Sequence, residues 1–232
     1  MTADDPTATT GPTPAPSPTA RAPRMSGEQR REQILAAALP VFAEGGYAGT
    51  TTDQVARAAG VSQPYVIRLF GSKQQLFLDL YRGVATRIIG VMSAVEPGPG
   101  AADRTGRAYV SLMADRDLLR VLMHGFTAAS DPQIGTTARH TLGEVFALFR
   151  ERVELPEGVD DAALTEAERS AALDEVARRF VADGMLINVL LAADAFAHVR
   201  EDRGLDALLA CVGVEAGAAA GAEIASRAGT PA

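Results

Sequence analysis

Two short helical segments, separated by a glycine-containing turn, constrain the fold of this chain more than any other feature. Residues 51–54 (TTDQ) form a capping box that starts one helix, and Gly60-Val61 makes a tight turn after it. Ser62 is placed to cap a second helix, which tolerates Pro64 in its first turn and ends at Gly71. Two helices of about two turns around such a turn are typical of a helix-turn-helix.

Helical periodicity continues through the rest of the chain. Apolar residues from Ile34 to Phe42 recur at spacings of three and four, and Gly45-Gly46 ends that helix. A capping box at residues 72–75 starts a long helix that runs through Ile88. Further helices are expected over about residues 102–130, with a break or bend near Asp115, and over about 134–153, 164–195 and 204–225. No segment alternates with period two, so the fold class is all-α.

Composition divides the chain into three parts. Residues 1–25 form a tail rich in Thr, Pro and Ala that we expect to be disordered, because it has almost no large apolar side chain to bury. Residues 26–89 hold the helix-turn-helix and residues 90–232 the remaining helices. The sequence shows neither a signal peptide nor a stretch long enough to span a bilayer, and its single cysteine, Cys211, fits a reducing cytoplasm. We therefore expect a cytoplasmic protein.

Charge is distributed unevenly along the chain. The net charge is −7, yet the segment from Arg21 to Gly90 holds nine Lys and Arg against five Asp and Glu, a balance of +4. The segment from Val91 to Ala232 has a balance of −9. A basic segment beside an acidic one is typical of a nucleic-acid-binding head on a body that does not bind nucleic acid.

The second short helix has an apolar face and a mixed face. Val66, Leu69 and Phe70 share one side of it. The opposite side contains Pro64, Ile67 and Arg68, flanked by Gln63 and Tyr65. Amide, aromatic and guanidinium groups of this kind can contact base edges and phosphates when a helix lies in the major groove. Thr51, Ser62 and Lys73 stand at helix N-termini, where hydroxyls, backbone N–H groups and a cation suit phosphate.

The run TTTDQVARAAGVSQPYVIRLFGSKQQLFLDLY, residues 50–81, resembles the signature of TetR/AcrR-family regulators. The resemblance implies an N-terminal three-helix helix-turn-helix DNA-binding domain on a helical ligand-binding and dimerisation domain. It implies a homodimer that binds a pseudo-palindromic operator on double-stranded DNA and acts as a repressor released by a small-molecule effector. It also implies that DNA contacts come from Thr51, Gln63, Pro64, Tyr65, Arg68 and Lys73. One residue departs from the pattern: many members have Tyr where this chain has Ile67, so Tyr65 substitutes for it only in part.

The resemblance also implies that the last two long helices form the dimer. The segment from Phe180 to Phe196 is apolar around nearly its whole circumference and must be covered on several sides. Small residues in the last helix would let a partner helix approach closely: Gly213, Ala216, Gly217 and Ala220. Packing of these helices within one subunit is the alternative.

Candidate effector-binding residues lie between these two regions. The apolar candidates are Met113, Leu122, Met123, Phe126, Phe146 and Phe149. His124 and Asn188 are the candidate polar anchors. Residues of each of these kinds are more often part of an ordinary core or satisfied buried polar groups, and together they indicate a mostly apolar effector. No cofactor or metal ion is expected, because the three histidines are far apart and there is one cysteine.

Three alternatives stay open at this point. An enzyme is disfavoured, since the chain has no nucleophile elbow, P-loop or dinucleotide-binding glycine motif. A helical adaptor that has lost its DNA affinity is supported only by Ile67 and the acidic balance. An activator in place of a repressor is equally compatible with the sequence. The arginines before and within the first helix, Arg21, Arg24, Arg30 and Arg31, either reach a minor groove or are simply solvated.

Overall fold

The computed structural model describes residues 25–156, 158–198 and 202–211, which are helical apart from short connections. No strand occurs in these ranges. The α-helices are α1 Gly27–Gly49, α2 Thr52–Ala58, α3 Gln63–Phe70, α4 Lys73–Ser93, α5 Ala101–Ser111, α6 Arg116–Thr127, α7 Pro132–Arg150, α8 Glu166–Ala192 and α9 Arg203–Cys211. Short 3-10 helices lie at Leu112–Ala114, Asp161–Ala163 and Ala195–Ala197. The predicted all-α fold class is confirmed.

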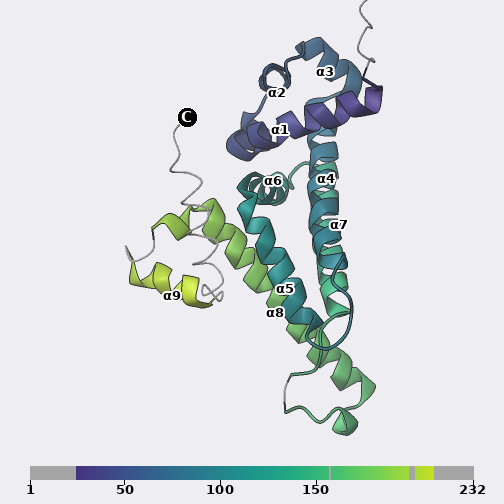
Figure 1. The fold of residues 1–232 in the computed structure, drawn as a ribbon, viewed down its shortest axis with the longest axis vertical. Helices are drawn as coiled ribbons and strands as arrows, with labels where there is room; N and C mark the ends of the chain where they lie inside the picture. The colour runs from purple at the N-terminus through teal and green to yellow at the C-terminus, as the bar shows by residue number, and fades with distance from the viewer. Residues whose placement is uncertain (1–24, 157, 199–201, 212–232) are drawn as a thin grey trace, which may run out of the picture.

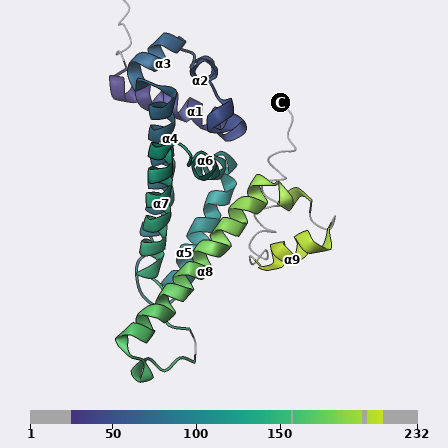
Figure 2. The same ribbon diagram turned by 180° about the vertical axis from the view of Figure 1, so that it is seen from behind.

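The helices form a small head and a long body (Figure 1). α1, α2 and α3 make the head, and α4 leads from it down the length of the body with α7 alongside. α5 and α8 form the other side of the body, and α6 crosses directly beneath the head, where it packs against α1 (Figure 2). α9 projects to one side from the upper end of α8. The boundary predicted between residues 89 and 90 lies within α4, so this helix belongs to both regions.

The regular part of α1 is interrupted at Gly46, one of the two glycines predicted to end the helix. Ser26 and Gln29 form a capping box at its start. Gly46 has φ 64° and ψ 177°, which interrupts the helix before one more turn carries it to Gly49. Because a positive φ costs glycine little and other residues more, the sequence Gly45-Gly46 stops the regular helix here.

Local caps also fix the helices of the body. Asp115 breaks the predicted 102–130 segment, and its carboxylate accepts a hydrogen bond from the backbone N–H of Leu118 at the start of α6 (3.2 Å). Asp131 caps α7 in the same way, with Pro132 in the first helical position. Thr165 and Glu168 form a capping box at the start of α8. The predicted break near Asp115 is therefore confirmed.

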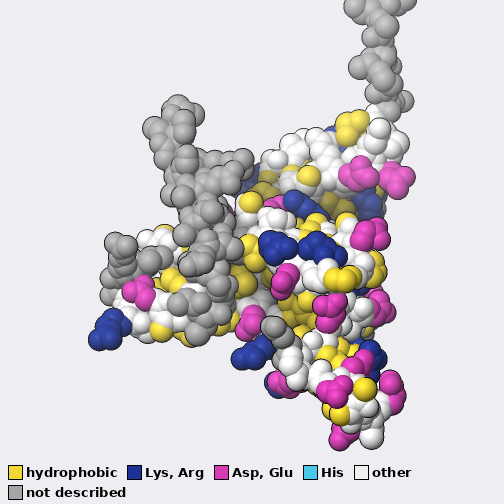
Figure 3. Space-filling model, turned by 60° about the horizontal axis from the view of Figure 1, so that its bottom comes forward, with side chains coloured by type: hydrophobic (Ala, Val, Ile, Leu, Met, Phe, Trp, Pro, Cys, Tyr) yellow, Lys and Arg dark blue, Asp and Glu magenta, His cyan; other side chains and the backbone are white. Residues whose placement is uncertain are grey.

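One hydrophobic core runs continuously from the head into the body. Where the head meets α4, Phe42, Phe77 and Tyr81 are fully buried, and their rings follow one another at centroid distances of 5.1 and 6.1 Å. Lower down, Phe149 and Phe180 continue the core between α7 and α8. On the outer surface of the lower body, acidic and basic side chains are interspersed (Figure 3). The head is thus held rigidly on α4 by packing, since contiguous apolar contacts bury the joint.

Some predicted features lie outside the described residues. These are the tail before Met25, with Arg21 and Arg24, and the small residues of the last helix, Gly213, Ala216, Gly217 and Ala220.

Candidate nucleic-acid interface and internal chamber

Hydrogen bonds within α2 and its turn give the helix-turn-helix its shape. The Thr51 hydroxyl accepts from the backbone N–H of Gln54 (3.2 Å), whose side chain accepts from the Thr51 backbone N–H (2.8 Å). Across the turn, the Val61 N–H donates to the Ala56 carbonyl (3.0 Å), and Gly60 has φ 66°. The predicted capping box and glycine turn are both confirmed, and the positive φ is the physical reason for Gly60.

α3 presents its predicted mixed face to the outside. Val66 and Phe70 are 0% and 4% exposed and pack into the head. Pro64 and Arg68 are exposed on the other side. The Arg68 guanidinium lies over the ring of Tyr65, 4.8 Å from its centroid, which orients the cation along the outer face by a cation–π interaction.

The first turn of α3 is held differently from the prediction. Ser62 is the N-cap residue, but its hydroxyl makes no capping hydrogen bond. Gln63 is half-buried, and its amide nitrogen donates to the hydroxyl of Thr52 in α2 (3.2 Å). Ile67 is also half-buried. The Ser62 hydroxyl is therefore available at the N-terminus of α3, whereas Gln63 must give up one hydrogen bond to reach a base.

Lys73, predicted to face phosphate, is hydrogen-bonded inside the head in this structure. Its ammonium group donates to the carbonyls of Tyr47 (2.9 Å), Ala48 (3.4 Å) and Thr50 (3.1 Å). It also lies 4.8 Å from the centroid of the Tyr47 ring. These carbonyls belong to the end of α1, where backbone acceptors lack helical partners. Since an ammonium group has three donors, Lys73 caps α1 from α4 in this structure.

Arg31 is a second cation of the head that serves its packing. Its guanidinium donates to the Leu69 carbonyl (3.0 Å), pairs with Asp79, and lies 4.4 Å from the centroid of the Phe70 ring. These contacts tie α1 to the end of α3 and to α4. Arg31 is therefore not part of an arm that extends into solvent, and Arg30 bonds to Gln33 on its own helix (2.8 Å).

The body encloses a chamber between α4, α5, α6, α7 and α8. The centre of a water-sized sphere can reach about 30 Å³ within it, and the space between its atoms is about 410 Å³ when the part open to solvent is included. Its lining consists of Ile88, Tyr109, Leu122, Phe126, Thr141, Leu142, Val145, Phe180, Val181, Gly184, Met185 and Asn188. A mostly apolar space with a few polar groups is the usual form of a small-molecule site.

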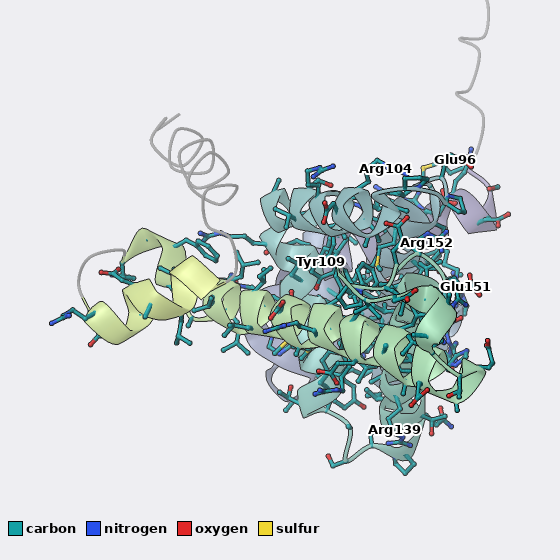
Figure 4. The ribbon with its side chains drawn as sticks, turned by 90° about the horizontal axis from the view of Figure 1, so that it is seen from below. Glu96, Arg104, Tyr109, Arg139, Glu151 and Arg152 are labelled. Carbon is teal, nitrogen blue, oxygen red and sulfur yellow. The ribbon has the colours of Figure 1, made fainter. Side chains whose placement is uncertain are left out.

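Tyr109 forms one wall of the chamber. Its ring meets that of Phe180 edge-on at a centroid distance of 6.1 Å, and its hydroxyl donates to the side-chain oxygen of Asn188 (3.0 Å). Between these two residues it lies over Gly184, where a Cβ atom would be 3.5 Å from the ring. Burial raises the pKa of Tyr109 to about 12, so the phenol is neutral near pH 7. Seen from below, Tyr109 lies among the helices and Arg139 lies at the outer edge (Figure 4).

The profile of the family described as "Bacterial regulatory proteins, tetR family" matches residues 34–80, from within α1 to within α4. Residues 34–80, which include the helix-turn-helix, are therefore similar to the DNA-binding part of TetR-family regulators. The chain is a DNA-binding transcriptional regulator and not an enzyme. Among the described residues, no helix combines the length and the apolar composition needed to span a bilayer.

Known proteins similar to this chain differ in how much of it they match. The HTH-type transcriptional activator FasR of Mycolicibacterium smegmatis is 26% identical over 194 residues, which cover 80% of each chain. The HTH-type transcriptional repressor AcnR of Corynebacterium glutamicum is 41% identical over 63 residues, 27% of this chain and 34% of AcnR. A TetR-like transcriptional regulator of Rhodococcus sp. RHA1 has a similar fold, with a TM-score of 0.58 at 20% identity over 84% of this chain and 96% of that one. The FasR match thus spans most of the chain, whereas the AcnR match spans about a quarter of it.

The residues predicted to bind the effector fall into different places in the structure. Leu122, Phe126 and Asn188 line the chamber, and Phe149 closes it from behind by stacking on Phe180. Met123 and Phe146 are half-buried outside the lining. Met113 lies in the short 3-10 helix before α6. The sequence reasoning missed Tyr109 and Thr141, but the apolar segment that begins at Phe180 did mark the wall formed by α8.

His124 points away from the chamber and contacts the head. Its Nε2–H donates to the Ala43 carbonyl of α1 (3.1 Å). Its ring lies 3.2 Å from where a Cβ atom of residue 46 would be, so a side chain there would collide with it. The next residue, Gly125, packs directly on α4: an added Cβ would be 1.9 Å from the ring of Tyr81. The predicted polar anchor of the chamber is instead a contact between body and head.

Three polar pairs further brace α6 and its neighbours. Arg87 of α4 pairs with Asp115 before α6 (2.6 Å), and Arg116 pairs with Asp194 beyond α8 (2.6 Å). The Gln74 amide nitrogen in the first turn of α4 donates to Asp131 at the start of α7 (2.7 Å). A displacement of α6 would therefore disturb contacts with the head and with the upper end of α8.

Proposed function

We propose that this chain is a dimeric repressor in the cytoplasm that binds a pseudo-palindromic operator and is released by a mostly apolar small molecule. The outer face of α3 is the observation that carries this proposal. In it, Arg68 and Pro64 are exposed and Tyr65 orients the guanidinium. A helix with this face can enter the major groove, where guanidinium and amide groups contact base edges.

In this proposal the residues of the head divide between bases and phosphates. Arg68, Gln63 and Tyr65 face the bases, with Pro64 and Ile67 against apolar parts of the groove. Thr51 and Ser62 stand at helix N-termini, where hydroxyls and backbone N–H groups suit phosphate oxygens. Lys73 has no such role, because its ammonium group is bonded to the end of α1.

The proposed dimer is supported by apolar side chains at the upper end of α8 and on α9. Val189 and Leu208 are 49% and 45% exposed, and exposed apolar side chains that lie together can mark an interaction surface. Beside them Leu190, Ala195 and Leu209 form a small buried cluster that joins the two helices. A second copy packed on this face would bury Val189 and Leu208 and hold two heads at a fixed distance. Heads must meet major grooves about 34 Å apart on the operator.

Release by an effector is supported by the position of α6. Its residues Leu122 and Phe126 line the chamber, while His124 between them contacts α1 of the head. A molecule that enlarges the chamber would push α6 and so alter the orientation of the head. Such a ligand shifts the protein away from the DNA-bound state only by its differential affinity for the two states.

An activator is the second candidate. It is favoured by one observation, since the relative that matches across both regions, FasR, is called a transcriptional activator. Transcription in vitro from the bound promoter separates the two roles, because a repressor lowers transcript yield as protein is added and an activator raises it.

The DNA-binding proposal is tested by gel-shift titration against DNA from upstream of the chain's own gene. We expect sequence-preferring binding that weakens steeply as salt rises. Replacing Arg68 by alanine should weaken binding by about tenfold to a hundredfold, since one good base contact contributes about 1–3 kcal/mol. Arg107→Ala, an exposed arginine on α5 in the body, is the matched control and should leave binding unchanged. Binding that ignores both sequence and Arg68 would refute the proposal.

A further inference from the structure

The wall of the chamber contains no charged side chain. Of its lining residues, Asn188, Thr141 and Tyr109 carry polar groups, and the others are apolar. Placing a charge in such surroundings without a counter-charge is strongly unfavourable. The composition of the wall therefore limits the class of molecule that the chamber can hold.

The polar groups gather at one end of the chamber. α7 runs downward from the head and α8 runs back upward beside it (Figures 1 and 2). Near the lower end the rings of Phe149 and Phe180 stack, with centroids 3.6 Å apart and planes 9° from parallel. Thr141 and Asn188 each lie eight residues above this stack on their own helices, a rise of about 12 Å. They therefore stand at a similar height, at the end of the chamber nearer the head.

Asn188 is the group at this end with unused hydrogen-bond donors. It is 2% exposed, and its side-chain oxygen is taken by the Tyr109 hydroxyl. Among the described residues, none accepts a hydrogen bond from its amide nitrogen. The Thr141 hydroxyl already donates to the Thr137 carbonyl (3.0 Å). Behind Thr141, the buried hydroxyl of Tyr81 has no partner with normal geometry among the described residues.

We propose that the effector is an uncharged, mainly apolar molecule with one hydrogen-bond acceptor, and that the amide nitrogen of Asn188 donates to that acceptor. This rests on the proposed function, since it names the kind of molecule that its chamber takes. A ketone, ester or amide on an aliphatic or aromatic body meets these conditions. A hydrocarbon would leave the Asn188 donors unpaired, and a carboxylate or an ammonium ion would be desolvated without a counter-charge.

Tyr109 is a positioning residue in this arrangement. Its hydroxyl fixes the Asn188 oxygen, so the amide nitrogen is directed to the remaining side. Its ring is held by Phe180 and passes over Gly184, which leaves it little freedom to turn. Loss of the hydroxyl alone should weaken the preference for an acceptor without removing the apolar site.

Four molecules of similar size provide the test: methyl octanoate, octanoate, octylamine and nonane. Binding to the full chain is measured by calorimetry and by thermal shift. We expect methyl octanoate to bind at least tenfold more tightly than each of the other three. Leaving a buried hydrogen-bond donor without an acceptor lowers the affinity by about tenfold or more. Tighter or equal binding of an ion or of nonane overturns the proposal, and so does the absence of methyl octanoate binding.

Variants assign the preference to its residues. In Asn188→Leu the preference for the ester over nonane should disappear, and in Tyr109→Phe it should shrink while nonane binding is kept. Phe146→Leu, half-buried on α7 outside the lining, is the control and should keep the full preference. If both Asn188→Leu and Tyr109→Phe keep the preference for the ester over nonane, the role of Asn188 is overturned. If Asn188→Leu does not fold, the result for Tyr109→Phe alone decides whether Asn188 has this role. Failure of the wild type to bind DNA would refute the proposed function instead, since calorimetry measures the ligand preference without DNA.

Discussion

The head and the body share one core, but they differ in where polar atoms without a partner lie. In the head, the cations Arg31 and Lys73 are bonded to backbone carbonyls, and the polar face of α3 is turned outward. Among the described residues, the side-chain atoms that are themselves fully buried and have no hydrogen-bond partner all lie outside α1–α3: Tyr81 Oη, Thr105 Oγ1, Arg116 Nε and Arg152 Nε. The head is thus internally complete and binds at its surface, whereas the body leaves polar capacity inside. The following predictions test this difference.

The largest effect on stability is expected at Gly125, where α6 packs most closely against α4. Gly125→Ala places a methyl group on the Tyr81 ring, where the space is already filled. We expect the free energy of unfolding to fall by about 2 kcal/mol, because overpacking of about 3 kcal/mol outweighs a gain in helix propensity of about 1 kcal/mol. Urea titration followed by circular dichroism measures it.

The control for this variant is another glycine in the middle of a helix. Gly143 of α7 is exposed, and nothing lies within 4 Å of a Cβ atom added there. Gly143→Ala should therefore stabilise the protein by about 0.5–1 kcal/mol. Equal effects of the two alanines would mean that α6 and α4 are not in contact at Gly125.

Lys73 and Arg68 differ in that the first is expected to stabilise the fold and the second to bind DNA. Lys73→Met should lower the free energy of unfolding by about 1.5 kcal/mol, because it removes charge-assisted hydrogen bonds to the end of α1. Arg68→Met should leave stability nearly unchanged. On DNA, Arg68→Met should weaken binding by about tenfold to a hundredfold, because a base contact is lost, whereas Lys73→Met should leave the slope of log affinity against log salt unchanged. A reduced slope for Lys73→Met would restore its phosphate contact.

Two tyrosines of the body provide the next comparison. Tyr109→Phe leaves the Asn188 oxygen buried without its donor, so we expect a loss of about 1 kcal/mol in the free energy of unfolding. Tyr81→Phe removes a buried hydroxyl that has no well-formed bond with the described residues, so stability should stay the same or rise. Burial raises the pKa of this hydroxyl, which agrees with its poor solvation. A larger loss for Tyr81→Phe than for Tyr109→Phe would show that Tyr81 is the better bonded of the two.

What the sequence predicts well is local. The capping box at Thr51 and the turn at Gly60 depend on residues within a few positions of each other, and the structure confirms both. The roles of Lys73 and His124 depend on carbonyls 23 to 26 and 81 residues away, which no local pattern reveals. The chamber shows the same limit. Leu122 and Asn188 were predicted as apolar and polar candidates, but the partner Tyr109 lies 79 residues from Asn188 and was missed.

The smallest effect is expected at Asp131, where the body contacts the first turn of α4. Hydrogen bonds from the backbone N–H of Ile134, from the side chain of Gln74 and from the backbone N–H of Gln133 lower the pKa of the Asp131 carboxyl. A lowered pKa in the folded state means that the carboxylate stabilises the fold above the unfolded pKa, near pH 4, and that this stabilisation is lost as the pH falls through the folded pKa. Asp131→Asn should therefore be less stable than the wild type at pH 7, and the difference should vanish at low pH. Because the carboxylate is partly open to solvent, the difference is small, and NMR titration of the Asp131 carboxyl is the sharper measurement. A pKa at or above the ordinary value would show that the hydrogen bond between Gln74 and Asp131 is not formed in solution, so the start of α7 would not brace the first turn of α4.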